Sequence, residues 1–464
     1  MASSNRTSVR AKSASRRPVE EARPVELPAP SRAELTVAFS QALDLAEGRP
    51  TGHAARVSYV ALSLARACGL AIEEQRTVFY AALLHDAGAA GASAETCRLL
   101  GLSEQAVFGG RPGQSPQQLA LEIVPANATA VVSVLRLHLK LGAEVARNLH
   151  FDQEVRKAIE THHERWDGQG YPRALKGEAI PVAGRVVAAA DVVESLIGVE
   201  SNPLTARRNL VAVLAEHGGR TLDPDLAHAA RDLVRSDSFW LGLHDSALTR
   251  ALASAAPDRQ NAEAAPEDLT TFARVFAELA DAKGEHTAAH ADRTAEVADQ
   301  IAQALEFGER ERALIRLAAL VHDIGLLGVA ARVIAKPDIL SLSEMEVMRK
   351  HPALSQQVLE TLPGLGDVAL WVGAHHERPD GRGYPEMLDE PSIPPEARIL
   401  AVADTYVALT SPRPYRRALS HEDAQQVLLG GVGTQLDGKI VKVFCSLPEA
   451  PTSSRTARRS RRTR

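Results

Sequence analysis

Two histidine-rich strings in this chain hold residue types that bind metal ions. One reads HHERWDGQGYP at residues 162–172, and the other reads HHERPDGRGYP at residues 375–385. A His-Asp pair precedes each string, at residues 85–86 and 322–323, and an isolated aspartate in an apolar stretch follows each one. Imidazole and carboxylate groups in such numbers are ligands of hard or borderline metals, so the pattern predicts two metal-binding sites.

The strings belong to an internal repeat. Before residue 91 the matched positions differ by 237, as for His53 and His290 (290 minus 53), and after residue 130 they differ by 213, as for Asp191 and Asp404. The first copy therefore carries about 24 extra residues near residues 91–130, where Gly-Gly and Pro-Gly pairs indicate an irregular excursion. The repeated positions are His53, His85, Asp86, His138, His162, His163 and Asp191 in the first copy, and His290, His322, Asp323, His351, His375, His376 and Asp404 in the second.

His138 is the least obvious member of the repeat. No proline follows it, whereas Pro352 follows His351, and the constant offset is what selects it; the competing interpretation is a histidine on a helix surface. The same plain interpretation, that a histidine merely caps or packs, applies to any single position. It does not account for seven positions repeated in order. Burying so many imidazoles and carboxylates without a metal would leave their polar groups uncompensated.

Helical periodicity predicts where these residues lie. In residues 312–324 the apolar positions recur with helical spacing, which places His322 and Asp323 at the end of a helix and Gly325 at a left-handed C-cap. On a helix, adjacent histidines point about 100° apart, so the pair at residues 375–376 is expected to serve two ions, or an ion and a substrate. These patterns predict an all-α bundle with a buried polar centre.

Length and composition bound the other possibilities. The 464 residues suffice for two or three domains, 45% apolar residues suffice for two substantial cores, and 4% aromatic residues leave few stacking surfaces for nucleic-acid bases. The net charge of −5 gives no reason to expect DNA binding, and three cysteines without metal or disulfide spacing fit a reducing cytosol. No apolar run reaches the length of a membrane span, and the basic N-terminus lacks the apolar part of a signal peptide, so a cytoplasmic location is expected.

The expected organisation is a pair of tandem domains. The segments are a disordered start at 1–32, a first domain at 33–249 with its insertion near 91–130, a linker at 250–268, a second domain at 269–446 and a basic, disordered tail at 447–464. The last ten residues hold six arginines. Such a tail suits nucleic acid or an anionic membrane, although a solvated tail is the favoured interpretation.

The repeated pattern resembles the HD superfamily of metal-dependent phosphohydrolases, and more narrowly its HD-GYP branch, whose members hydrolyse cyclic di-GMP. The resemblance covers nearly all of residues 35–235 and 270–446, and the HHExxDGxGYP string is its specific part. It implies two tandem HD-type helical bundle domains with buried metal sites. It also implies at least two divalent ions, Fe or Mn, in each active domain.

The resemblance assigns roles to individual residues. The repeated histidines and aspartates of both copies match metal ligands, with His322 and Asp323 as the catalytic pair and Asp323 as the bridging carboxylate. In the second copy Tyr384, Arg413 and Arg416 match residues that hold the substrate.

The first copy departs from the family at its substrate residues. The family usually places a lysine after His-Asp-Ile-Gly, where it reaches the scissile phosphate, but these positions hold Ala89 in the first copy and Leu326 in the second. Tyr171 is retained, whereas Glu200 and Pro203 stand where the two arginines are expected. An acidic residue would then lie where a phosphate should rest.

Two further positions distinguish the second copy. Val407 replaces an aspartate that the family places three residues after the ligand Asp404. His286, four residues before His290, stands where some members supply a further ligand, although a surface histidine is an equal interpretation.

The function expected from these residues is a metal-dependent phosphodiesterase that acts on a cyclic dinucleotide, cyclic di-GMP above others, through the C-terminal domain. Two adjacent ions lower the pKa of a shared water towards about 7 and neutralise charge on the phosphate. The alternatives are hydrolysis of another nucleotide or phosphoester, and a non-catalytic module that binds nucleotides or signalling proteins. The missing lysines favour the non-catalytic module, and the retained ligands argue against it. Nucleic acid is not expected as a partner, apart from the basic tail.

Overall fold

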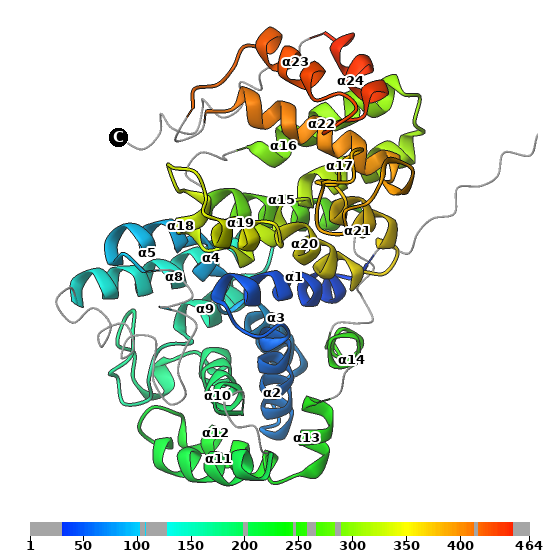
Figure 1. The fold of residues 1–464 in the computed structure, drawn as a ribbon. Helices are drawn as coiled ribbons and strands as arrows, with labels where there is room; N and C mark the ends of the chain where they lie inside the picture. The colour runs from blue at the N-terminus through cyan, green and yellow to red at the C-terminus, as the bar shows by residue number, and fades with distance from the viewer. Residues whose placement is uncertain are drawn as a thin grey trace, which may run out of the picture.

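The computed structural model describes residues 30–102, 107, 128–197, 203–244, 247–257, 266–283, 289–412 and 416–448. These residues form α-helices and short 3-10 helices with isolated β-bridges, so the expected all-α class is confirmed for the described part of the chain. The first half contains α1 (Arg32–Glu47), α2 (His53–Ala67), α3 (Ile72–Leu84), α4 (Ala87–Gly91), α5 (Ser93–Leu100), α8 (Ala128–Asn148), α9 (Gln153–Thr161), η2 (Gly177–Ala179), α10 (Val182–Ile197), α11 (Pro203–His217), α12 (Pro224–Leu233), α13 (Asp237–Leu243) and α14 (Leu248–Ser254). The second half contains α15 (Pro266–Lys283), α16 (His290–Ala304), α17 (Glu309–Val321), η4 (Ile324–Gly328), α18 (Ala331–Ile334), α19 (Leu342–Met348), α20 (His351–Glu360), α21 (Gly366–Gly373), η5 (Glu390–Ser392), α22 (Pro395–Thr410), α23 (His421–Gly430) and α24 (Gly438–Cys445) (Figure 1).

Helix α17 shows how the sequence dictates these elements. Its apolar side chains recur at helical spacing, Ile315 and Ala319 are fully buried, and the helix packs against α15, α16, α21 and α22. On another face, Arg312 and Arg316 donate to Asp299 of α16 at 3.0 and 2.7 Å. Partly exposed ion pairs of this kind contribute little net stability. The helix is therefore held mainly by burial of its apolar stripe.

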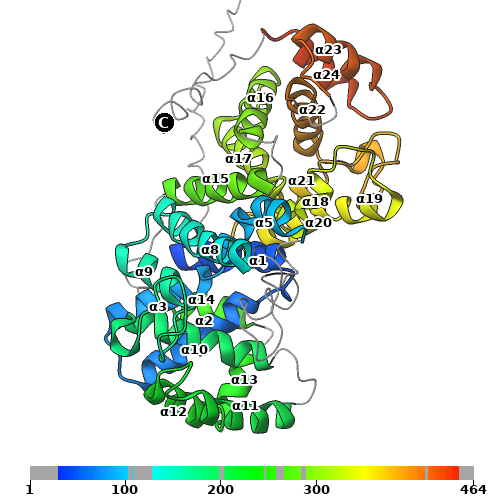
Figure 2. The same cartoon turned by 90° about the vertical axis from the view of Figure 1, so that its left-hand side faces the viewer.

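The first helix of each half lies between the two halves (Figures 1 and 2). Helix α1 packs against α4 of its own half and against η4 and α20 of the other, and α15 packs against both η4 and α4. The Phe39 ring of α1 lies 4.6 Å from that of Phe276 and 5.9 Å from that of Phe272, both in α15, measured between ring centroids. Because α4 and η4 directly follow the two His-Asp pairs, both turns are backed by one hydrophobic core that runs through the two halves.

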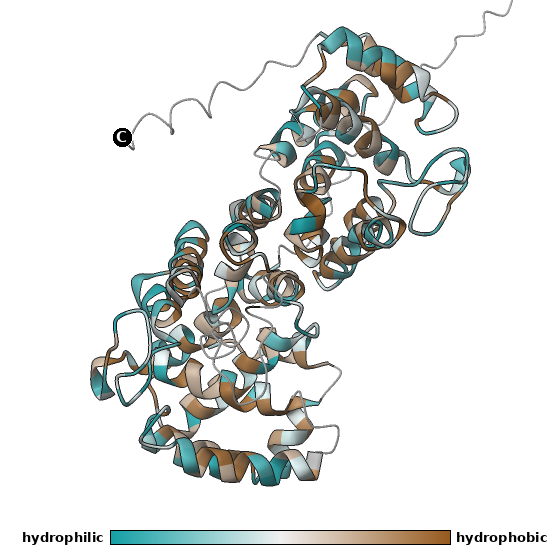
Figure 3. Cartoon of the chain, turned by 60° about the vertical axis from the view of Figure 1, so that its left-hand side comes forward, coloured by the Kyte–Doolittle hydropathy of each residue, from teal (hydrophilic) through white to brown (hydrophobic). Residues whose placement is uncertain are grey.

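Apolar residues lie along helices of both halves, and hydrophilic residues predominate in the peripheral loops (Figure 3). None of the helices in the described ranges is both long and apolar enough to cross a membrane.

Two segments contain more helix than the sequence indicated. Residues 250–254, expected in the linker at 250–268, belong to α14, which packs against α1 and buries Leu252 and Ala253. Residues 93–100, expected in an irregular insertion, form α5, which packs against α8 and against α15 and α18 of the other half. Both helices are short and are stabilised by distant segments, which local periodicity does not reveal.

Several expectations fall outside the described residues. They concern the segment 1–29, most of the insertion at 103–127, the latter part of the linker, the tail from residue 449, and Glu200, His286 and Arg413.

Candidate metal centres and substrate pocket

The turn after α17 presents the His-Asp pair of the second copy. Helix α17 ends at Val321, and His322 follows as its C-cap with Nδ1 2.8 Å from the Ala319 carbonyl oxygen. Asp323 then precedes η4, and its Oδ2 lies 3.3 Å from His322 Nε2. The pair therefore sits at the junction of two helices, where both side chains leave the backbone towards the same space.

Gly325 serves close packing, and the left-handed C-cap expected from the sequence is wrong. Its φ is not positive, and a Cβ at this position would lie 2.1 Å from the His351 carbonyl oxygen. The Gly325 N–H donates to Ser355 Oγ at 2.8 Å, and that hydroxyl donates to the His322 carbonyl oxygen at 2.7 Å. Helix α20 thus approaches the turn closely, which brings His351 to the His-Asp pair.

The adjacent histidines lie beyond the end of their helix. Helix α21 ends at Gly373, and His375 and His376 follow in a turn with ring centroids 4.1 Å apart. Together with His351 they form a group whose candidate ligand atoms all lie within 4.8 Å of one another. The expectation that His375 and His376 require two ions, or an ion and a substrate, is therefore wrong, because the 100° separation of adjacent side chains holds only inside a helix. Both side chains can face one ion.

Backbone hydrogen bonds fix the tautomer of five site histidines. Each has Nδ1 within hydrogen-bond distance of the carbonyl oxygen three residues earlier, and because a carbonyl oxygen only accepts, Nδ1 carries the proton. When the imidazole is neutral, Nε2 then keeps the lone pair, as in a metal-bound imidazole. The buried Nε2 atoms of His85, His162 and His322 make no hydrogen bond within the described ranges. The five Nδ1–O distances are 2.8 Å for His85, 2.7 Å for His162, 2.8 Å for His322, 2.8 Å for His351 and 2.6 Å for His375.

Asp323 lies between two groups of histidines in the second copy. Its Oδ1 is 3.2 Å from His351 Nε2, and its Oδ2 is 3.3 Å from His322 Nε2 and 3.9 Å from His290 Nε2. Asp404 Oδ1 is 3.0 Å from His290 Nε2. A carboxylate with one oxygen towards each group suits a bridging ligand, so the donor set fits a centre of two metal ions.

The carboxylates and the histidines shift one another's protonation. Burial lowers the pKa of His322, but the charges of Asp323 and Asp404 outweigh it and raise the pKa to about 9. Burial, followed by the charge of His351, lowers the pKa of His376 to about 4. His376 is thus neutral at pH 7, whereas His322 must give up a proton when an ion binds.

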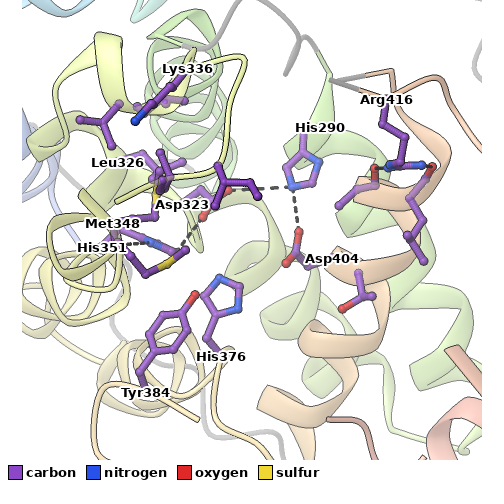
Figure 4. Close-up of a pocket in the computed structure, with 18 of the residues that line it drawn as sticks. His290, Asp323, Leu326, Lys336, Met348, His351, His376, Tyr384, Asp404 and Arg416 are labelled. Atoms are coloured by element: carbon purple, nitrogen blue, oxygen red, sulfur yellow. Dashed lines mark hydrogen bonds and ion pairs between the residues drawn. The ribbon is translucent and has the colours of Figure 1, made fainter. Parts of the chain in front are cut away.

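The second copy's cluster opens into a pocket of about 860 Å³ (Figure 4). This volume lies within the range of small-molecule sites. Leu326 and Lys336 line one side of the pocket, Tyr384 lies beside His376, and Arg416 lies on the opposite side. Lys336 is therefore a pocket cation close to the position where the family's lysine is missing, and its Nζ pairs with a Glu344 carboxylate oxygen at 2.6 Å.

The guanidinium of Arg416 is anchored to backbone carbonyls. Its Nη1 donates to the Leu409 carbonyl oxygen at 2.8 Å, and its Nη2 donates to that of Ala408 at 2.9 Å. These carbonyls belong to the C-terminal end of α22, where a cation is favourable. Arg416 therefore lines the pocket with part of its hydrogen-bonding capacity already used.

The first copy repeats the bridging geometry. Asp86 Oδ1 lies 3.1 Å from His138 Nε2 and 3.6 Å from His162 Nε2, and its Oδ2 lies 3.1 Å from His85 Nε2. The structure thus brings His138, the least obvious histidine, to the carboxylate of Asp86. Gly88 permits this approach, because a Cβ there would lie 1.7 Å from the His138 carbonyl oxygen.

Asp191 stands apart from the other members of the first copy. Its Oδ1 is 3.8 Å from His53 Nε2, whereas the equivalent distance between Asp404 and His290 is 3.0 Å. The compact groups of the first copy are His53, His85 and Asp86, and Asp86, His138, His162 and His163, whereas in the second copy Asp404 groups with His290 and His322.

The tyrosines also differ between the copies. Tyr384 lines the pocket and is partly exposed, but Tyr171 is 8% exposed within an apolar cluster, and its hydroxyl makes no hydrogen bond among the described residues. Ala89, Val107 and Leu135 belong to this cluster. Segments of the insertion and of α8 therefore cover the side of the first copy where the second copy has its pocket.

The glutamate of each string has a role that the sequence did not reveal. Glu377 is 4% exposed, and its two carboxylate oxygens accept from the Glu386 and Leu388 N–H groups at 2.7 and 2.9 Å. Glu164 makes the matching contacts in the first copy. This clamp closes the loop that sets the Tyr384 ring 4.9 Å from the His376 ring. Its occurrence in both strings was the available signal.

Comparisons with known proteins identify a family and several relatives of this chain. The sequence matches the profile described as HD domain at residues 114–226 and 274–440. It is 29% identical over 426 residues to the 3'3'-cGAMP-specific phosphodiesterase 3 of Vibrio cholerae, a match that covers 87% of this chain and 92% of that protein. It is 39% identical over 160 residues to the cyclic di-GMP phosphodiesterase response regulator RpfG of Xanthomonas campestris pv. campestris, covering 33% of this chain and 42% of that protein. The crystal structure of the cyclic GMP-AMP specific phosphodiesterase V-cGAP3 of V. cholerae superposes with a TM-score of 0.66 at 26% identity, covering 90% of this chain and 99% of that one.

Proposed function

This chain belongs to the HD domain family, and we propose that it is a metal-dependent phosphodiesterase that hydrolyses a cyclic dinucleotide in the pocket of its second copy. One observation carries the proposal. The second copy combines a carboxylate placed between two histidine groups with an adjoining pocket of about 860 Å³, and Asp323 belongs to both. The non-catalytic alternative accounts for the pocket but not for a carboxylate placed between two groups of histidines.

The proposed ligands of the two ions are His290, His322, Asp323, His351, His375, His376 and Asp404. In the first copy the proposed ion-binding group is Asp86, His138, His162 and His163, and the matching positions beside it hold His53, His85 and Asp191. The proposed ions are Fe or Mn, which imidazole and carboxylate groups suit. When bound, they supply Lewis acidity that activates water and neutralises charge developing on the phosphate.

The chain's own residues supply positioning. Asp323 holds the two halves of the centre together, and the histidines keep Nε2 aimed inward through their Nδ1–H bonds. Tyr384, held against His376 by the Glu377 clamp, offers its hydroxyl and ring to the substrate. Lys336 and Arg416 face the pocket from opposite sides, so they suit the two phosphates of a cyclic dinucleotide.

The choice of substrate follows from the relatives. Two relatives named for 3'3'-cGAMP match 87% and 89% of the chain at 29% and 28% identity. A third one named for 3'3'-cGAMP matches 36% of the chain, and those named for cyclic di-GMP match 23% to 38%. We therefore place 3'3'-cGAMP beside cyclic di-GMP, the substrate expected from the sequence, as the first pair to compare.

We propose domains at residues 33–249 and 269–446, with hydrolysis confined to the second. Support comes from the buried Tyr171 of the first copy and from the apolar cluster around it. The first copy then serves as a structural partner, since α1 and α15 form a common layer behind both His-Asp turns.

The test is hydrolysis of both dinucleotides by the purified full chain, prepared anaerobically with added Mn or Fe and followed by chromatography of the products. Asp323→Ala should abolish turnover, and the matched Asp86→Ala variant in the first copy should retain most of it. If Asp86→Ala is inactive and Asp323→Ala is active, the assignment is reversed. A folded, metal-loaded parent that binds but cleaves neither dinucleotide would favour the non-catalytic function.

A further inference from the structure

We propose that the first copy holds a single metal ion and that the guanidinium of Arg49 takes the place of the second. The ion would be bound by Asp86, His138, His162 and His163, whose candidate ligand atoms all lie within 4.8 Å of one another. The other position, beside His53 and His85, would be closed to a cation. This goes beyond the hydrolytic function of the second copy.

The repeat shows that three residues around this position differ between the copies. At an offset of 237, Arg49 matches position 286, which holds a histidine in the second copy. At an offset of 213, Ser195 matches Ala408 and Glu194 matches Val407. The first copy therefore has a guanidinium, a hydroxyl and a carboxylate where the second has none of these groups. The changes are complementary in charge and in hydrogen bonding.

These residues draw Asp191 away from the histidines. Arg49 Nη1 lies 3.5 Å from Ser195 Oγ, and that hydroxyl donates to Asp191 Oδ1 at 3.3 Å. The same carboxylate oxygen is 3.8 Å from His53 Nε2. Ala408 cannot make the equivalent hydrogen bond. In the second copy, Asp404 accordingly lies 3.0 Å from its histidine.

Arg49 is a buried cation among carboxylates. Its side chain is 13% exposed, and its Nε lies 3.8 Å from Glu47 Oε2, on a side chain that is 2% exposed. The carboxylates of Asp191, Asp86 and Glu194 also act on its charge. A buried guanidinium needs such compensation. A divalent ion at the same place would both repel it and compete for the same oxygens.

At the proposed position of the missing ion, the ligand atom of His53 is already oriented for metal binding. His53 Nδ1 lies 2.5 Å from Glu194 Oε2, and Arg56 donates to the same carboxyl group at 2.7 Å, so the His53 ring is held with Nε2 facing inward. A carboxylate behind a histidine is the usual support of a metal-bound imidazole. Loss of the guanidinium should therefore open the position to an ion.

The metal content of the full chain tests the proposal. After anaerobic loading with Mn, elemental analysis should give three ions per chain, two in the second copy and one in the first. Arg49→Met, which keeps an unbranched apolar stem without the charge, should give four. Arg66→Met, on the outer side of α2, should stay at three, and His163→Ala should fall to two.

Anomalous scattering from crystals of the Mn-loaded parent separates the copies and needs no variant. One peak among Asp86, His138, His162 and His163 is expected in the first copy. Two peaks there, or none, would overturn the proposal, as would a folded Arg49→Met protein that stays at three ions. Absence of ions from the second copy would instead bear on the proposed function.

Discussion

Leu326→Lys tests whether the missing cation limits hydrolysis. Leu326 lines the pocket together with Asp323, so an ammonium there would lie beside the metal centre (Figure 4). A charge-assisted contact to phosphate is worth roughly 1.5–3 kcal/mol. If it forms in the transition state, kcat/KM should rise about ten- to a hundred-fold. Lys336 lies near the same position, so repulsion between the two ammonium groups places the expected gain at the lower end.

The structural cost of Leu326→Lys should be small. Leu326 is partly buried and packs against the cluster of Val329, Ala330 and Val333, and the lysine stem can cover the same surface. The loss of stability should be about 1 kcal/mol or less. Leu326→Met is the matched control, because it keeps the apolar volume without a charge.

The assay is steady-state hydrolysis of both cyclic dinucleotides at equal metal loading, with Tm measured for each variant. The lysine variant should exceed both the parent and the methionine variant. The first copy offers no functional control, since Ala89 is 0% exposed in an apolar cluster and a lysine there would destabilise the fold. A folded, metal-loaded Leu326→Lys protein that is no faster than the parent would refute the reasoning and would favour another substrate or a non-catalytic role.

Three further outcomes are expected. Its carboxylate neighbours raise the pKa of His322 to about 9 without an ion, so the apparent Mn affinity should rise with pH up to about 9 and then level off. Titration calorimetry in two buffers should detect proton release on Mn binding at pH 7, and binding without proton release would contradict this prediction. Glu377→Ala removes two hydrogen bonds of 2.7 and 2.9 Å and should raise KM more than it lowers kcat, with intermediate values for Glu377→Gln. If the alanine variant and the parent have equal KM and kcat, the Glu377 clamp does not position Tyr384 for the substrate. Phe39→Ala should cost about 3–5 kcal/mol of unfolding free energy and lower one common Tm, whereas two transitions of which one shifts would argue against a shared core.

The sequence by itself determined the repeat, the all-α class and the residue types of both centres. Two constant offsets selected seven positions in each copy, and the structure gathers all of them except Asp191 into groups of candidate ligands around Asp86 and Asp323. Even His138, which local sequence did not support, lies 3.1 Å from the carboxylate. Such positions are readable because metal binding demands particular donor atoms, and because helical burial imposes a period on the apolar residues.

The tertiary structure determined which groups surround each candidate metal ligand. Gly325 is the point where α20 packs closely against the His-Asp turn. His375 and His376 lie beyond the end of α21. Both features follow from packing between segments that are distant in sequence. Asp191 has the same residue type as Asp404 but a different partner, since the Ser195 hydroxyl, itself 3.5 Å from Arg49 Nη1, donates to its carboxylate. The apolar cover around Tyr171 depends likewise on how Val107 of the insertion and residues of α8 pack against that ring. A repeat in sequence fixes which groups are available, and only the three-dimensional neighbours of each group determine its charge, its partner and its access to substrate.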